Sequence, residues 1–193
     1  FEVEGLEISA DMIAQAKPVL QQQIHRGDMD QWIPKQAYAS ILVPAFTLQL
    51  SSDPLSTLKH WRGWLRPGGA IYLTTFMPYA ELLGEFPEAE WYEDHKTTLP
   101  DGSHAVLETR HELQIEQQIL IRSHRYRIEQ RPDATHECRQ CIRWGEPAQW
   151  REWLEKAGFD VEMQFLDWDE SYIDDAPDPE QHEGMITTLG RVL

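Results

Sequence analysis

The chain has 193 residues, 41% of them hydrophobic, so it is long enough and apolar enough to build one domain-sized core and is not a disordered chain. Its 33 acidic and 17 basic residues give a net charge of −16, which disfavours nucleic acid and anionic membranes as partners. Two cysteines exclude a disulfide scaffold and favour the cytoplasm, and no apolar run approaches the ~20 residues of a membrane span.

The first 76 residues alternate between strand and helix patterns. The apolar run at 38–46 is typical of a strand buried on both faces, and Pro18 interrupts the first helix. Alternation with short connections favours an α/β fold with a doubly wound, mostly parallel sheet. The predicted elements are strand 1–8, helix 9–23, strand 24–29, strand 38–46, helix 54–65 and strand 70–76.

From residue 77 the pattern changes to the polar and apolar alternation of antiparallel strands. Residues 77–145 predict an antiparallel sheet inserted into the fold, with residues 78–100 as loop or irregular helix. The whole chain, 1–193, is interpreted as a single domain carrying this insertion. The predicted elements are strands 104–113, 117–129 and 139–144, helix 146–158, and strands 160–168 and 185–193, the last two paired antiparallel.

Four segments then stand in a characteristic order. They are GLEISADM at 5–12, GDM at 27–29, LRPGGAIYL at 65–73 and WLEKAGFDV at 153–161. Their order and spacing resemble the class I S-adenosylmethionine-dependent methyltransferases, from the second strand of that fold to its last. The resemblance implies a Rossmann-like fold, S-adenosylmethionine as cofactor, and methyl transfer to a small-molecule nucleophile by in-line displacement.

The resemblance also implies a cofactor site at the carboxyl ends of the parallel strands, where ligands bind in open sheets. Glu7 would accept hydrogen bonds from the ribose hydroxyls, and Asp28 one from the adenine amino group. Apolar side chains would cover the adenine, and the end of strand 38–46 would lie beside the methionine part. The implied residues are Glu7, Ile8, Met12, Asp28, Met29, Val43, Pro44 and Phe46.

One feature of the family is missing from the sequence. Its first strand and glycine-rich loop precede the acidic second strand, and no GxGxG occurs here. Without that central strand, two buried strands would leave backbone groups unpaired, at about 1–3 kcal/mol for each group. We therefore expect that the native protein has roughly 35–60 further N-terminal residues, enough for one strand, one helix and a lead-in.

The insertion carries the candidates for acceptor binding, because it follows the fifth strand of the family fold. Trp91, Tyr92, Arg143 and Trp144, with Tyr126, could hold a cationic amine through cation–π attraction, or could simply cover the apolar face of the insertion. No catalytic base stands out among the five histidines of this region. His111 and His124 are possible cross-strand neighbours. The five are His95, His104, His111, His124 and His136.

Two segments resemble metal-binding motifs only weakly. Cys138 and Cys141, near His136, lack the further ligands of a zinc site, so packing within a strand is the preferred interpretation. The acidic stretch 167–171 begins like a calcium loop but has Tyr172 where that loop needs glycine, which favours a solvated loop. No metal site is predicted.

Two other functions stay open. A nicotinamide-dependent oxidoreductase also uses an acidic ribose-binding residue, but no Tyr-x-x-x-Lys follows here. A non-catalytic methyltransferase-like module could instead serve as a homodimer, with the inserted strands as its interface.

Overall fold

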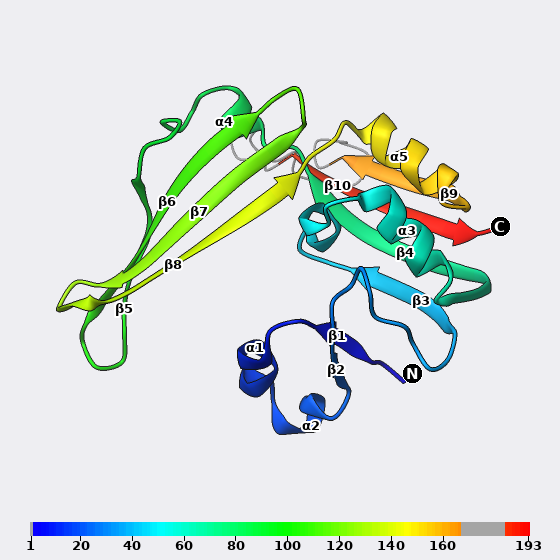
Figure 1. Ribbon diagram of the computed structural model, residues 1–193, viewed down its shortest axis with the longest axis horizontal. Coiled ribbons are helices and arrows are strands. Elements are labelled where there is room, and N and C mark those ends of the chain that lie inside the picture. Colours follow the sequence, from blue (N-terminus) through cyan, green and yellow to red (C-terminus); the bar gives the residue numbers. More distant parts are fainter. Residues whose placement is uncertain (1, 167–183) are drawn as a thin grey trace, which may run out of the picture.

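The chain forms three separate sheets (Figure 1). The computed structural model describes residues 2–166 and 184–193. A two-stranded sheet pairs β1 with β2, a mixed sheet has the order β3-β4-β10-β9, and an antiparallel sheet has the order β5-β6-β7-β8. The acidic stretch 167–171 lies outside the described residues.

The N-terminal unit is a parallel strand pair joined by two short helices. Ser9 caps the first helix by accepting a hydrogen bond from the Met12 amide, as its position in the sequence predicts. Pro18 is the first residue of a second helix, so the predicted helix 9–23 is in fact two. The elements are β1 (Gly5–Glu7), α1 (Ala10–Gln15), α2 (Pro18–Gln21) and β2 (Ile24–Arg26).

The mixed sheet contributes most of the strand residues of the hydrophobic core. Its strand β3 runs parallel to β4, whereas β10 is antiparallel to both β4 and β9. The predicted antiparallel pairing of the last two strands is therefore confirmed. The elements are β3 (Tyr38–Val43), the 3-10 helix η1 (Thr47–Leu50), α3 (Pro54–Arg62), β4 (Leu65–Phe76), α5 (Pro147–Lys156), β9 (Phe159–Leu166) and β10 (Met185–Val192).

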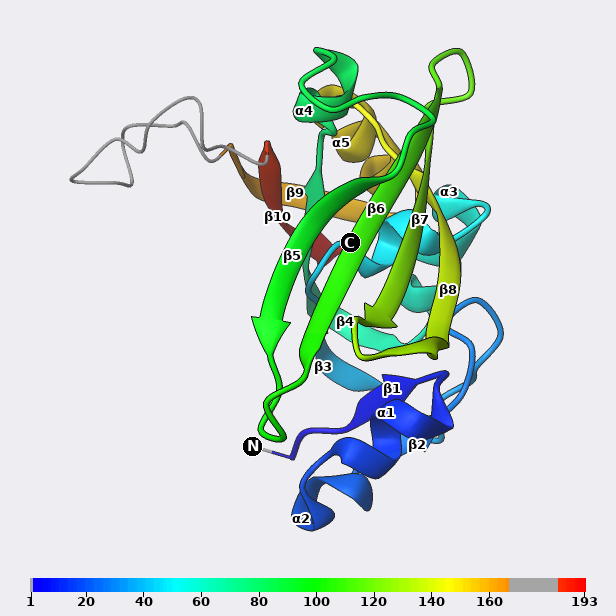
Figure 2. The same cartoon turned by 90° about the vertical axis from the view of Figure 1, so that its left-hand side faces the viewer.

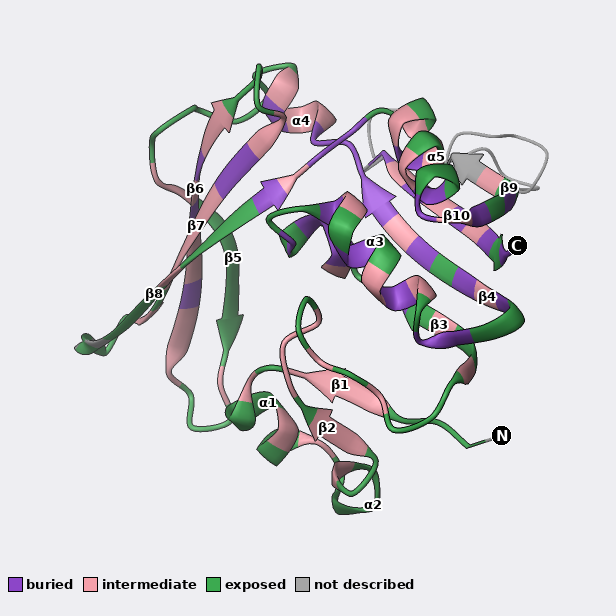
Figure 3. Ribbon diagram, turned by 45° about the vertical axis from the view of Figure 1, so that its right-hand side comes forward, coloured by how far each residue is buried: buried purple, intermediate pink, exposed green. Residues whose placement is uncertain are grey.

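Helices α3 and α5 cover one face of the mixed sheet, and the core lies between them and the strands (Figure 3). Leu58 of α3 and Leu154 of α5 are fully buried there with Leu73 of β4. On the opposite face, one cross-strand row contains Leu42, Tyr72, Leu189 and Met163, and Leu42 is 70% exposed. The prediction that strand 38–46 is buried on both faces is therefore wrong for this side.

The antiparallel sheet has four strands where three were predicted. The segment 92–98 has no apolar alternation, yet it pairs with the next strand along its length and becomes an edge strand. Its strand structure therefore depends on pairing with residues 104–109, which the local sequence does not predict. The elements are α4 (Tyr79–Leu82), β5 (Tyr92–Thr98), β6 (His104–Gln114), β7 (Ile119–Ile128) and β8 (Arg131–Arg143).

The inserted sheet lies across the edge to which the carboxyl ends of β3 and β4 point (Figure 2). Leu120 and Ile142 face each other across β7 and β8 and join the same core cluster as Val43 and Phe76. The side chain of Gln49 in η1 completes the joint, since its Nε2 donates to the carbonyls of Phe76 and Arg143 and its Oε1 accepts from the Phe76 amide. Among the described residues, no helix combines the length and apolar character needed to cross a membrane.

Candidate functional site

The carboxyl end of β1 presents a carboxylate held in place by the turn that follows it. Glu7 is the last residue of the strand, and its Oε1 accepts a hydrogen bond of 2.7 Å from the Ser9 amide. The Glu7 carbonyl accepts from the Gly27 amide at 3.0 Å, which ties this point to the end of β2. The other carboxylate oxygen, Oε2, has no hydrogen-bond partner in the described part of the chain. The turn therefore orients Glu7 and leaves one oxygen free to accept.

Two apolar side chains are exposed beside this carboxylate. Ile8 is 63% exposed and Met12 is 59% exposed, although both are large hydrophobic residues. Ile8 follows Glu7 directly, and Met12 lies in the first turn of α1. Exposed apolar surface next to a half-buried hydrogen-bond acceptor suits a ligand that has both a flat apolar ring and hydroxyl groups.

The loop after β2 is fixed by its own backbone. Asp28 accepts a hydrogen bond from the Asp30 amide through Oδ1 at 2.9 Å, which makes it a turn residue in addition to its predicted role. The carbonyl of Met29 accepts from Trp61 Nε1 of α3 at 3.0 Å, and the Met29 side chain packs against the core. Both predicted residues thus lie at the carboxyl end of β2, the strand paired with β1.

The turn that ends β3 has an unusual backbone. Ala45 and Phe46 both have positive φ, at 53° and 62°, although neither is glycine. Thr47 supports the turn by donating from its hydroxyl to the Pro44 carbonyl at 2.8 Å. The Phe46 ring packs against Phe76, with 4.8 Å between centroids. Consecutive left-handed residues cost energy and gather at functional sites, so this turn marks the carboxyl edge of β3 as a candidate.

The four residues predicted to bind the acceptor do not line one surface. Trp91 lies under the guanidinium of Arg125, 4.0 Å from its ring centroid, whereas Tyr92 stacks on Phe86 and is edge-on to His111. Arg125 and His111 occupy opposite faces of the inserted sheet, so Trp91 and Tyr92 do as well. Trp144 is buried in the core.

The strand register fixes how His111 and His124, the possible cross-strand neighbours, lie relative to each other. His111 faces Arg122 across β6 and β7, and His124 faces Thr109, so the two histidines are diagonal neighbours on one face. His111 is 1% exposed, and neither of its ring nitrogens has a partner among the described residues. Thr109 Oγ1 lies 2.7 Å from Asp94 Oδ2 and 3.0 Å from His124 Nδ1.

Sequence reasoning missed this polar group because it depends on strand register. Asp94, Thr109 and Arg122 carry no motif, and they meet only when β5, β6 and β7 pair as they do. Arg122 extends the group to α4, where it forms an ion pair with the buried carboxylate of Glu81. Its guanidinium also lies 5.7 Å from the ring centroid of Phe76, at the end of β4. The polar face therefore adjoins the carboxyl edge of the mixed sheet.

The two cysteines lie on opposite faces of the inserted sheet. Cys138 is opposite His124, and Cys141 is opposite Ile121. Both thiols are free. No group of three or more His, Cys, Asp and Glu side chains suited to a metal ion gathers within residues 2–166 and 184–193.

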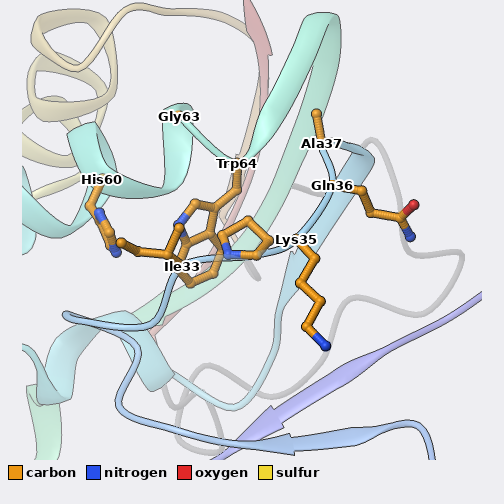
Figure 4. Close-up of a pocket in the computed structure, with 8 residues that line it drawn as sticks. Ile33, Lys35, Gln36, Ala37, His60, Gly63 and Trp64 are labelled. Atoms are coloured by element: carbon orange, nitrogen blue, oxygen red, sulfur yellow. The ribbon is translucent and has the colours of Figure 1, made fainter.

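A shallow hollow of about 400 Å³ lies elsewhere, at the amino end of β3. Ile33, Lys35, His60 and Trp64 are among the residues that line it (Figure 4). His60 Nε2 is hydrogen-bonded to the Trp32 carbonyl oxygen at 2.8 Å. Because ligands of open α/β sheets bind at the carboxyl ends of the strands, this hollow is not the candidate site.

No protein-family model and no curated protein sequence matches this chain. Solved structures do. An S-adenosylmethionine-dependent methyltransferase from Clostridium acetobutylicum ATCC 824 aligns with a TM-score of 0.71 at 10% identity, covering 97% of this chain and 73% of that chain. The CcbJ methyltransferase from Streptomyces caelestis aligns with a TM-score of 0.70 at 19% identity, covering 99% and 74%.

A third structure, an amino pentose methyltransferase from Micromonospora echinaspora, aligns with a TM-score of 0.66 at 16% identity, covering 99% of this chain and 74% of that chain. At these identities the likeness establishes the fold. The chain has the Rossmann-like fold of S-adenosylmethionine-dependent methyltransferases, as the four sequence segments indicated. The prediction of a mostly parallel sheet is wrong for the mixed sheet, because β10 runs antiparallel to both of its neighbours.

Proposed function

We propose that this chain catalyses methyl transfer from S-adenosylmethionine to a small-molecule nucleophile. One observation carries the proposal: nearly the whole chain, 97–99%, aligns with methyltransferase structures. The carboxylate of Glu7 stands at the carboxyl end of a parallel strand, where the fold binds nucleosides. Free thiols at Cys138 and Cys141 support work in the reducing cytoplasm.

The described residues fit the nucleoside half of the cofactor. The free Oε2 of Glu7 would accept from the ribose hydroxyls, and the exposed side chains of Ile8 and Met12 would lose water on covering an adenine face. When bound, S-adenosylmethionine supplies an electrophilic methyl group. The further residues proposed to hold it are Asp28, Met29, Val43, Pro44 and Phe46.

We further propose an amine on a sugar or similar small molecule as the acceptor. Neighbouring structures include an amino pentose methyltransferase, a sugar N-methyltransferase and a glycopeptide N-methyltransferase. The face of the inserted sheet that adjoins Phe76 has carboxylate, hydroxyl and imidazole groups suited to an amine and its hydroxyl neighbours. The insertion would then act as the cap of the acceptor site. Acceptor binding by Trp91, Tyr92, Arg143 and Trp144 is part of this proposal. Of these four, Tyr92 lies beside His111, on the face of the inserted sheet that adjoins Phe76.

A strand from residues upstream of Phe1 is proposed to pair between β1 and β3. Those two strands belong to different sheets and have no mutual ladder. They are tied by a hydrogen bond between the Tyr38 hydroxyl and the Glu4 carboxylate, at the start of each strand. The exposed row of Leu42 and Tyr72 would give an accompanying helix an apolar face. Binding of S-adenosylhomocysteine should be tighter in a chain carrying the upstream residues than in residues 1–193 alone.

Replacing Glu7 tests the proposed function. Glu7→Gln keeps an acceptor for the Ser9 amide but removes the charge, so S-adenosylhomocysteine should bind about tenfold to a hundredfold more weakly by isothermal titration calorimetry. Glu85→Gln, an exposed carboxylate after α4, is the matched control and should bind normally.

An acceptor panel with methyl-labelled S-adenosylmethionine completes the test. Labelling of amino sugars or small amines supports the proposal, and labelling of RNA or protein alone contradicts it. A stable dimer that binds no S-adenosylhomocysteine would instead identify a non-catalytic module. Bound cofactor absorbing at nicotinamide wavelengths would identify an oxidoreductase.

A further inference from the structure

We propose that Nε2 of His124 accepts the proton that the acceptor amine loses before methyl transfer, and that Thr109 and Asp94 are positioning residues that fix the tautomer of this imidazole. The inference rests on the proposed function and assigns it a general base. Three strands supply the three side chains, β5 for Asp94, β6 for Thr109 and β7 for His124.

The hydrogen bonds of Thr109 determine which nitrogen of His124 carries hydrogen. Thr109 Oγ1 donates its single hydrogen to Asp94 Oδ2, because an ionised carboxylate can only accept. The same oxygen can then only accept from His124 Nδ1, 3.0 Å away, so Nδ1 is the protonated nitrogen. The lone pair of the neutral ring is consequently on Nε2, which has no partner among the described residues.

His124 belongs to a row of β7 side chains that begins at the carboxyl edge of the mixed sheet. Leu120, Arg122 and His124 alternate along the strand and therefore share one face. Leu120 is in the core with Val43, and the guanidinium of Arg122 lies 5.7 Å from the Phe76 ring. His124 is the next side chain of this row, about 7 Å further from that edge. A small acceptor between the two would contact both the end of β3 and the imidazole.

The surroundings of His124 keep the ring neutral. Partial burial is the main cause that lowers its pKa from the ordinary 6.5, and the charge of Arg122 lowers it further, while Asp94 opposes both. Glu81 is paired to Arg122. A neutral ring is the form that can take a proton at neutral pH. The titratable or charged side chains on this face are Tyr92, Asp94, His95, His111, Arg122, Tyr126, His136 and Cys138.

The step balances in one proton and two electron pairs. An ammonium has no lone pair, so it must lose a proton before it can attack, and His124 Nε2 takes that proton. The freed amine lone pair forms the new bond to the methyl carbon, and the electrons of the broken carbon–sulfur bond stay on sulfur. The imidazolium then releases its proton to solvent. Base assistance of this kind contributes typically a hundredfold or more to the rate.

The tautomer is tested by nitrogen-15 NMR of the histidine rings, without any methyl acceptor. We expect His124 in the Nδ1-protonated form, and a mixture of both forms in Thr109→Val. Finding Nε2 protonated in the unaltered protein would overturn the assignment. Asp94→Asn should lower the pKa of His124 further, because it removes the charge that raises it.

The catalytic role is tested with His124→Asn and a matched control. Asparagine can still donate to Thr109 but has no basic nitrogen, so kcat for the best amine of the panel should fall about a hundredfold, and the acid limb of its pH profile should disappear. His104→Gln is the control, because His104 also pairs its Nδ1 with a threonine hydroxyl, that of Thr98, but lies at the far end of the sheet beside the turn of Gly102. It should leave kcat unchanged.

The outcomes separate the two proposals. Imidazole added to His124→Ala should restore part of the rate, and S-adenosylhomocysteine should bind every variant normally. Unchanged kcat and pH profile in His124→Asn would overturn the role of His124 while leaving methyl transfer intact. Loss of cofactor binding in the unaltered protein would count against the proposed function itself.

Discussion

The two four-stranded sheets of this chain are stabilised in opposite ways. In the mixed sheet, Ile71, Leu73 and Ile186 are fully buried under α3 and α5. In the inserted sheet, one face carries ion pairs such as Arg125 with Glu137 at 2.7 Å and Arg127 with Glu108 at 3.3 Å. These pairs are partly exposed, so each contributes only about 0–1 kcal/mol. The mixed sheet therefore supplies more of the stability than the ion-paired face of the inserted sheet does.

The largest effect expected from this difference is in the core. Leu73→Ala should lower the free energy of unfolding by about 2–5 kcal/mol, because it removes packed methyl groups and leaves a cavity. The matched change Leu107→Ala, at a half-buried position of β6, should cost clearly less. Urea denaturation followed by circular dichroism measures both. Equal losses would mean that the inserted sheet is stabilised by apolar packing after all.

The joint between the two sheets should be the next most sensitive point. Gln49→Leu leaves the Phe76 amide and the Arg143 carbonyl without their side-chain partner in a buried place, at about 1–3 kcal/mol for each group. The loss should appear as a lower midpoint in urea. Gln36→Leu, at an exposed position before β3, is the control and should be neutral. A neutral Gln49→Leu would show that the sheets are joined by apolar contacts alone.

The smallest effect concerns the link between β1 and β3, and it is spectroscopic. Burial and the hydrogen bond with Glu4 raise the pKa of Tyr38 to about 12. Since the folded value exceeds the unfolded value of 10.0, this contribution to stability is complete below pH 10 and is lost as the pH rises toward 12. Burial also raises the pKa of Tyr79, Tyr92 and Tyr126. Absorbance at high pH should therefore show a last tyrosine step, near pH 12, that is absent in Tyr38→Phe and present in Tyr72→Phe. Its persistence in Tyr38→Phe would assign the late step to another residue.

Much of the fold could be predicted from local signals. Asp53 and Pro54 mark the start of α3, and Ser9 marks that of α1, because capping depends on a few adjacent residues. Glu7 could be placed at a strand end from its neighbours alone. The hydrogen-bonded group of Asp94, Thr109 and His124 could not be predicted. Thr109 and His124 are 15 residues apart, and a shift of one residue in the register of their strands would place them on opposite faces.

The sequence by itself determined most of the strands and helices and their order, the acidic residue at the end of β1 and the net charge of −16, because these depend on composition and short-range periodicity. Only the tertiary structure decided that residues 92–98 are a strand, that β1–β2 forms a sheet apart from β3, and that Asp94, Thr109 and His124 meet. Each of these depends on which strands pair and in which register. Such pairing is fixed by the packing of the whole chain and not by any segment alone.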